Sequence, residues 1–179
     1  MTNERWEIDS SHSGIHFAVR HMVVAKVRGQ FARWSGTVQA PADGSFENST
    51  VNVTIDATSI ETGVADRDNH LKSPDFLDVA QYPELTFSGK RLAGTDTLAG
   101  DLTIHGVTRP VTLDLEYAGT RKDPWGNVRA GFSAKTSINR KDFGLDWNQV
   151  LEAGGVLVGE KVEIELEIEA VKQQAVVAA

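Results

Sequence analysis

The sequence predicts an all-β fold, an antiparallel sandwich or barrel of eight strands with one or two short helices. Three observations predict it. Apolar and polar residues alternate with period two in eight segments, which is the pattern of strands with one buried and one solvated face. Turn-forming sequences such as PADG, AGTD, HGVTRP and DPWGN separate these segments. The 3.6-residue periodicity of amphipathic helices is almost absent.

The alternation is clearest in the last segment, KVEIELEIEA, where the four apolar residues from Val162 to Ile168 alternate with four glutamates. In the segment of residues 26–40 the apolar residues change from odd to even positions between Phe31 and Trp34, which indicates a β-bulge. Four glutamates on one face keep that face in water, so the other face must contact apolar groups. The expected strands are residues 13–21, 26–40, 50–58, 84–89, 97–106, 110–119, 127–138 and 161–170.

Helical signals are limited to two short segments, residues 63–79 and residues 145–153. Within the first, SPDFLD is typical of a helix start, with Ser73 as the cap and Pro74 at the first helical position. We expect residues 1–179 to form a single domain, with residues 171–179 as a loose tail.

Composition excludes several classes of function. The 179 residues carry a net charge of −7, which argues against nucleic-acid binding because phosphate contacts need a basic face. There is no cysteine, so disulfides, thiolate metal sites and cysteine nucleophiles are excluded. The start, MTNERWEIDS, has no apolar run typical of a secretory signal, and no stretch approaches the roughly 18 apolar residues of a membrane span. We therefore expect a cytoplasmic protein.

Eight strands closed into a barrel leave an interior wide enough for side chains or one small ligand. Many inward positions carry medium-sized side chains, which is compatible with a hollow interior. The residues expected to line such a cavity are Ile15, Phe17, Val19, Phe31, Val53, Ile55, Phe87, Leu102, Ile104, Leu113, Leu115, Phe132 and Leu166.

The segment DSSHSGIHFAVRH, which begins at Asp9, contains the residue types of a hydrolytic triad and of a metal site. Ser13 directly follows His12, so on an extended chain the two side chains point to opposite faces. No Gly-x-Ser-x-Gly nucleophile elbow occurs in the chain. His12 and His16 share a parity that His21 lacks, whereas ligands on one strand face need two-residue spacing. We expect no catalytic residues and no metal, and interpret Asp9 and His12 as residues that close a turn.

Two further polar segments are candidates for the mouth of the barrel. DRDNHL contains Arg67 and His70, and is either a helix cap with local ion pairs or a polar lid. INRKDFG contains Arg140, which either belongs to a turn or holds an anionic head group with its guanidinium fork. Together with His21, at the inward end of its strand, these residues form the expected head-group or mouth set.

Five blocks of the sequence together resemble the YceI-like family in order and spacing. The resemblance implies a lipocalin-like, eight-stranded antiparallel barrel with a long apolar cavity. It also implies binding of polyisoprenoid chains, isoprenoid quinones or similar long amphiphiles, and no catalytic activity. Many relatives look periplasmic, whereas this sequence shows no leader. The blocks, within roughly residues 5–170, are DSSHSGIHFAVRHMVVAKVRGQF, TSIETGVADRDNHLKSPDFLDVAQYPELTF, LAGDLTIHGVTRPVTLDLEY, SINRKDFGLDWN and VGEKVEIELEIEA.

Residues and resemblance together predict a non-enzymatic carrier of a long apolar amphiphile, with a polyisoprenoid or isoprenoid quinone as ligand. Two alternatives remain. The first is an isomerase or hydrolase that uses His12 or His70. The second is a protein whose interior is filled by its own side chains and which acts by binding partner proteins. We expect no cofactor, although an isoprenoid lipid or quinone could co-purify. The expected partner is a long-chain isoprenoid or other lipid, without nucleic acid or a membrane span, and a homodimer is compatible with the sequence.

Overall fold

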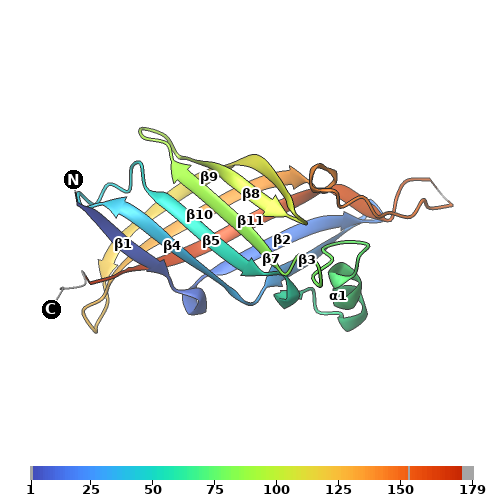
Figure 1. The fold of residues 1–179 in the computed structure, drawn as a ribbon, viewed down its shortest axis with the longest axis horizontal. Helices are drawn as coiled ribbons and strands as arrows, with labels where there is room; N and C mark the ends of the chain where they lie inside the picture. Colours follow the sequence, from blue (N-terminus) through green and yellow to red (C-terminus); the bar gives the residue numbers. More distant parts are fainter. Residues whose placement is uncertain (1, 153, 175–179) are drawn as a thin grey trace.

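Strands β1, β4, β5, β7, β8, β9, β10 and β11 follow one another around a ring, and β11 pairs back with β1 to close it. The computed structural model describes residues 2–152 and 154–174 (Figure 1). All of the pairings are antiparallel, so the predicted eight-stranded antiparallel barrel is confirmed. The strands are β1 (Asn3–Ile8), β2 (Gly14–His21), β3 (Ala25–Phe31), β4 (Trp34–Pro41), β5 (Thr50–Asp56), β6 (Ile60–Glu61), β7 (Glu84–Arg91), β8 (Thr97–Ile104), β9 (Val107–Lys122), β10 (Val128–Asn139) and β11 (Val158–Lys172).

The three remaining strands extend the ring at one end. The first part of β11 pairs with β2, its last residues pair with β1, and β3 and β6 continue the sheet beyond β2. Consequently β1 and β2 act as one bent strand, interrupted by the 3₁₀ turn Ser10–His12. The strand predicted over residues 26–40, with a bulge between Phe31 and Trp34, needs correction: a bend at residues 32–33 divides it into β3 and β4, which pair with different strands. Strand β1 was not among the expected strands, because the short segment Asn3–Ile8 holds too few alternations of apolar and polar residues.

Only one α-helix forms in the described residues, α1 (Ala65–Lys72). It lies within the predicted helical segment 63–79, which is therefore confirmed in part, whereas the helix predicted over residues 145–153 does not form in residues 145–152. Ser73 ends α1 rather than starting a helix, since its hydroxyl donates to the His70 carbonyl at 2.6 Å. Residues 145–152 are irregular, because buried contacts to their carbonyls replace helical hydrogen bonds, and residue 153 lies outside the described residues. No helix of the described chain is both long and apolar enough to span a membrane.

The prediction of a loose tail from residue 171 onward is wrong for its first residues. Val171 and Lys172 belong to β11, where they pair with Glu7 and Trp6 of β1. The Gln173 amide still donates to the Arg5 carbonyl at 2.8 Å. The ring closure therefore extends to the end of β11, and residues 175–179 lie outside the described residues.

The buried apolar residues form two clusters. The larger contains Ile55, Leu85 and Ile104 of the barrel strands near α1. The smaller closes the opposite end, where both termini lie (Figure 1). At its centre Phe46, from the loop between β4 and β5, packs its ring 5.0 Å from that of Trp6. We call this smaller cluster, Trp6, Val38, Ala40, Phe46, Ala130 and Ala170 with the adjoining Tyr117 and Phe132, the aromatic plug.

Candidate ligand cavity

The barrel encloses an apolar cavity of about 600 Å³. All eight ring strands contribute side chains to its wall, together with β2, β3, α1 and the segment that precedes β11. The structure places all thirteen residues of the predicted wall on this cavity. Strand register explains their convergence: Val53 is paired with Phe87, and Phe87 with Leu102, so three adjacent strands direct side chains into the same space.

Glycines in the wall make room for aromatic rings. A β-carbon at Gly29 would lie 2.4 Å from the ring of Phe17, and one at Gly89 would lie 2.6 Å from the ring of Phe87. A β-carbon at Gly100 would also meet the ring of Phe87, at 2.8 Å. The ring of Phe17 therefore lies against Gly29 of β3, and the ring of Phe87 lies against Gly89 of β7 and Gly100 of β8. Because they cover glycine backbone instead of crossing the barrel, the interior stays open.

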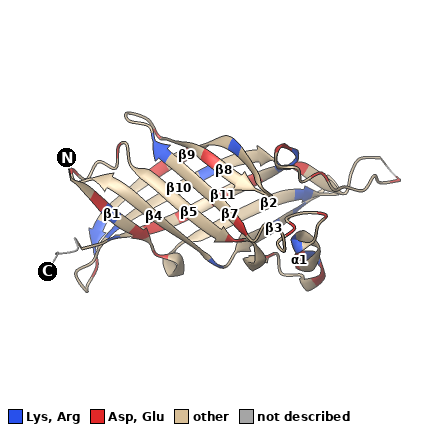
Figure 2. Cartoon of the chain, viewed as in Figure 1, with Lys and Arg blue, Asp and Glu red and all other residues tan. Residues whose placement is uncertain are grey.

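The cavity opens at the end of the barrel that carries α1. Arg20, His21 and Asp66 line the cavity and are exposed, and they come from the end of β2 and from α1. The helix carries acidic and basic residues side by side (Figure 2). The neighbouring turn, residues 22–24, exposes three apolar side chains in succession. The mouth thus has a mixed polar and apolar rim, whereas the interior is apolar.

Arg140 lies at the mouth but is 3% exposed. Its Nε donates to the Gly159 carbonyl at 2.8 Å, and its two terminal nitrogens donate to the carbonyls of Leu145, Trp147 and Val158 at 2.5, 2.9 and 3.2 Å. Burial lowers the pKa of Arg140 below its ordinary value. Four of the five N–H groups of the guanidinium are therefore occupied by the backbone. Of the two roles considered for Arg140, these contacts favour the structural one, because the residue anchors the segment before β11.

Arg67 and His70 also line the mouth and also have partners within the protein. Arg67 donates to the hydroxyl and the carbonyl of Thr62 at 2.7 and 2.8 Å. His70 Nε2 lies 2.9 Å from Asp75 Oδ2, and its ring packs edge-on against Trp147 with 4.6 Å between centroids. These contacts fix α1 over the barrel end. Arg20 and His21 are exposed, so they are the basic groups of the rim that are more solvated than Arg67 and His70.

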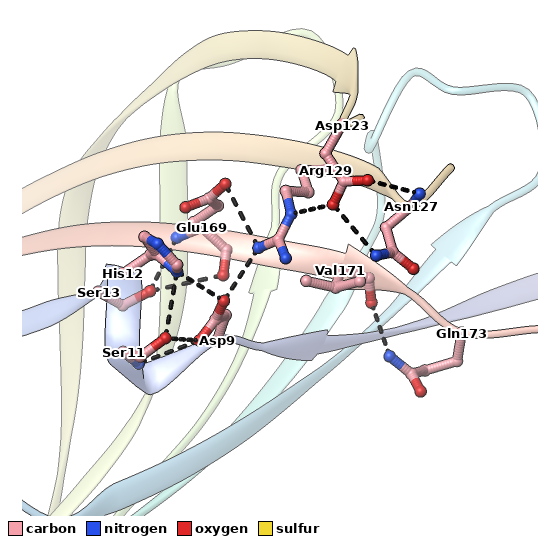
Figure 3. A network of polar contacts seen from close by, with 10 residues as sticks. All are labelled: Asp9, Ser11, His12, Ser13, Asp123, Asn127, Arg129, Glu169, Val171 and Gln173. Atoms are coloured by element: carbon pink, nitrogen blue, oxygen red, sulfur yellow. Dashed lines mark hydrogen bonds and ion pairs between the residues drawn. The ribbon is translucent and has the colours of Figure 1, made fainter. Parts of the chain in front are cut away.

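Asp9, Ser11 and His12, at the start of the triad-like segment, bond one another and do not line the cavity (Figure 3). His12 Nδ1 lies 2.8 Å from Asp9 Oδ2 and 3.1 Å from Ser11 Oγ. A catalytic triad needs the acid and the nucleophile on opposite ring nitrogens, whereas both contacts here fall on the same nitrogen. Ser13 Oγ accepts from the Glu169 amide at 2.9 Å and so fixes the strand start to β11. The interpretation of Asp9 and His12 as turn-closing residues is confirmed.

Within residues 2–152 and 154–174, no three histidine, aspartate or glutamate side chains converge as metal ligands. Cavity residues that the sequence did not predict include Phe46, Trp147, Ser49 and Arg91. The first two lie in loops, where no periodicity marks an inward residue. Arg91 had a usable signal, because it shares the inward parity of Leu85, Phe87 and Gly89 on β7.

A closed antiparallel barrel of eight strands around an apolar, end-opening cavity defines a lipocalin-like architecture. The chain belongs to the YceI-like family, whose domain model matches residues 6–170. A UPF0312 protein of Staphylococcus aureus is 36% identical over 170 residues, which cover 94% of this chain and 97% of that protein.

Solved structures agree with this assignment. The YCEI protein of Campylobacter jejuni is 28% identical, with a TM-score of 0.70 over 87% of this chain and 90% of that chain. A polyisoprenoid binding domain from Saccharophagus degradans is 15% identical, with a TM-score of 0.68 over 94% of this chain and 98% of that chain. At that identity the similarity shows a shared fold.

Proposed function

We propose that this protein binds and carries a long apolar amphiphile, a polyisoprenoid or an isoprenoid quinone, inside the barrel. The single observation that carries the proposal is the apolar cavity of about 600 Å³ that opens at one end. Its volume falls within the range of about 300–1,000 Å³ that is typical of small-molecule sites. The Saccharophagus degradans domain, a polyisoprenoid binding domain by name, supports the choice of ligand class.

The volume of the cavity limits the length of tail that it can enclose. If each carbon occupies about 30 Å³, the share of one molecule in liquid water, the cavity holds about twenty carbons, or about four isoprene units. Each buried methylene contributes about 0.8 kcal/mol, so even half of such a tail gives about 8 kcal/mol, before the costs of immobilisation. Hydrophobic transfer alone is therefore sufficient for tight binding, and a longer tail must extend through the mouth.

The geometry of the polar residues favours carriage over catalysis. The Asp9–His12 pair lies outside the cavity, and the hydroxyl of Ser73 near the mouth donates to a backbone carbonyl. His70 contacts Asp75 and aromatic rings. None of these contacts pairs a nucleophile with a base facing the cavity, which is the arrangement that covalent catalysis requires.

The test has two parts. Mass spectrometry of lipid extracted from the purified protein identifies the ligand that co-purifies. The delipidated protein is then titrated with prenyl alcohols of increasing chain length. We expect the affinity to rise with each isoprene unit up to about four units and to change little beyond that length. An affinity that is independent of chain length, or no uptake of any prenyl probe, would contradict an internal tail site.

A further inference from the structure

The closed end of the cavity contains polar atoms that the protein does not satisfy. Trp6 Nε1, Ser49 Oγ and Arg91 Nε are buried and have no hydrogen-bond partner. They are the full set of such side-chain atoms in the described part of the chain, and they gather around the aromatic plug rather than across the molecule. Ser49 and Arg91 line the cavity. Buried donors without acceptors are rare in folded proteins, so their concentration at one place requires an explanation.

Backbone contacts hold Ser49 and Arg91 side by side. The Arg91 amide donates to the Ser49 carbonyl at 2.9 Å, where β7 ends next to the start of β5. One terminal nitrogen of Arg91 donates to the Ser45 carbonyl at 3.2 Å, in the loop that carries Phe46. Arg91 thus lies beneath this loop, with its Nε buried, and it is one of the residues that line the cavity. No carboxylate among the described residues forms an ion pair with Arg91.

We propose that this floor, formed by Ser49 and Arg91, is a polar subsite that binds an oxygen acceptor of the ligand, preferably a carboxylate. The inference rests on the proposed function and adds a direction to it: the amphiphile enters polar end first, and its tail points toward the mouth. A guanidinium N–H and a hydroxyl provide two donors and one positive charge. A carboxylate supplies the matching acceptors and the opposite charge, which gives the strongest type of hydrogen bond.

The mouth competes poorly for the same group. Arg140 donates to four carbonyls, Arg67 to Thr62, and His70 contacts Asp75. The more solvated basic groups there are Arg20 and His21, which are exposed. Exposed charges contribute little to ion pairing, because water screens them. At the floor, by contrast, Ser49 Oγ and Arg91 Nε are buried, and an unsatisfied buried donor is costly.

Three probes with the same prenyl chain test this direction: a carboxylic acid, an alcohol and a hydrocarbon. For the wild-type protein we expect the acid to bind about tenfold to a hundredfold more tightly than the hydrocarbon, with the alcohol between them. Arg91→Met should remove the preference for the acid and leave the affinity for the hydrocarbon unchanged. Ser49→Ala should reduce the preference by a smaller factor. Arg20→Met, which removes a cation of the mouth, is the matched control and should keep the preference intact.

The outcomes separate the two proposals. If no probe binds, the proposed function fails; if all three bind equally to the wild type, only the polar floor is wrong and water satisfies its donors. If Arg20→Met abolishes the preference for the acid and Arg91→Met retains it, the polar end lies at the mouth and the inference is overturned. If Arg91→Met does not fold, NMR of the acid with a labelled carboxyl carbon decides. Bound to the floor, this carboxyl should have a lowered pKa, which Ser49→Ala should raise; an unshifted pKa would overturn the inference.

Discussion

Arg129 connects three parts of the chain at the barrel end that carries the termini (Figure 3). Its Nε donates to Asp123 Oδ2 at 2.8 Å, and one terminal nitrogen donates to Asp9 Oδ2 at 2.9 Å. The same nitrogen lies 3.5 Å from Glu169 Oε1 on β11. A guanidinium suits this position because its planar set of donors reaches several carboxylates at once. The network therefore links the turn after β1, the turn between β9 and β10, and β11.

The acid sensitivity of the protein should depend on Arg129. The Arg129 guanidinium lowers the pKa of Asp123 to about 2, and bonds from Ser11 and Arg129 hold the pKa of Asp9 well below its ordinary range. Carboxyls whose pKa is depressed by folding stabilise the native state above their unfolded value, about 3.9, and that stability is lost as the pH falls through the folded pKa. The melting temperature should thus fall between about pH 4 and pH 2.

Arg129→Met should flatten this fall, because it removes the group that holds these carboxylates ionised. Melting curves measured across the acid range test the prediction. Arg28→Met is the control, since Arg28 is an exposed residue of β3 and should leave the pH profile unchanged. Identical pH profiles for wild type and Arg129→Met would show that the network does not control acid stability.

At the scale of the element, the wall strands combine alternating apolar residues with glycines that keep the interior open. Gly29 on β3 shows this most directly. A β-carbon there would meet the side chains of Phe17 and Thr62, at 2.4 and 2.9 Å, rather than backbone. Side chains can move away from an added β-carbon at modest cost. Because Phe17 lines the cavity, its ring has space to move into the cavity. The glycine therefore determines where the ring lies more than whether the strand forms.

Gly29→Ala should displace the Phe17 ring into the cavity and weaken the binding of a prenyl probe about tenfold or more, with a small loss of stability. The double variant Gly29→Ala/Phe17→Ala should recover affinity, because the ring that blocks the interior is then absent. Probe titration and thermal melting of both variants test this. If the single variant binds as the wild type does, the ring has another place to go and the glycine does not keep the cavity open.

The sequence predicted most of the strands, but not the helix end at Ser73 or the loop contacts of Arg140. Period-two alternation identified strands such as β11, because one face is solvated by glutamates and the other lies against the apolar cavity. The same parity argument placed the thirteen wall residues on the cavity. The helix-start signature SPDFLD was misleading for Ser73, because a serine hydroxyl can cap either end of a helix, and here it caps the end of α1. The sequence could not decide between the two roles considered for Arg140, because its four carbonyl partners lie in residues 145–147 and at the start of β11, which no local pattern connects to it.

At the scale of the whole molecule, a hollow barrel makes stability depend on occupancy. A ligand that binds only the folded state stabilises it by about 2.7 kcal/mol at a free concentration one hundred times Kd. Because the aromatic plug and the pairing of β1 with β11 join the strands independently of any ligand, we expect the barrel to fold without one. Delipidation should therefore lower the melting temperature without unfolding the protein.

Val53 is the position that best tests whether the interior is vacant. It lies on β5 beside Gly36 and Phe87, and it faces the cavity. In a solidly packed interior, Val53→Trp would cost about 1–3 kcal/mol through overpacking. In a vacant cavity the indole has space to enter, so the stability of the empty protein should change little. The same indole then occupies the volume that the prenyl tail needs.

We expect Val53→Trp to melt near the temperature of the delipidated wild type and to lose the rise in melting temperature that a prenyl ligand causes. Thr54→Trp adds the same side chain to the same strand, but on the exposed face, and should keep the ligand-induced rise. Thermal melting with and without a prenyl alcohol of about four units measures both effects. A normal ligand-induced rise in Val53→Trp would mean that the tail binds elsewhere. A large loss of stability without ligand would mean that the interior is packed.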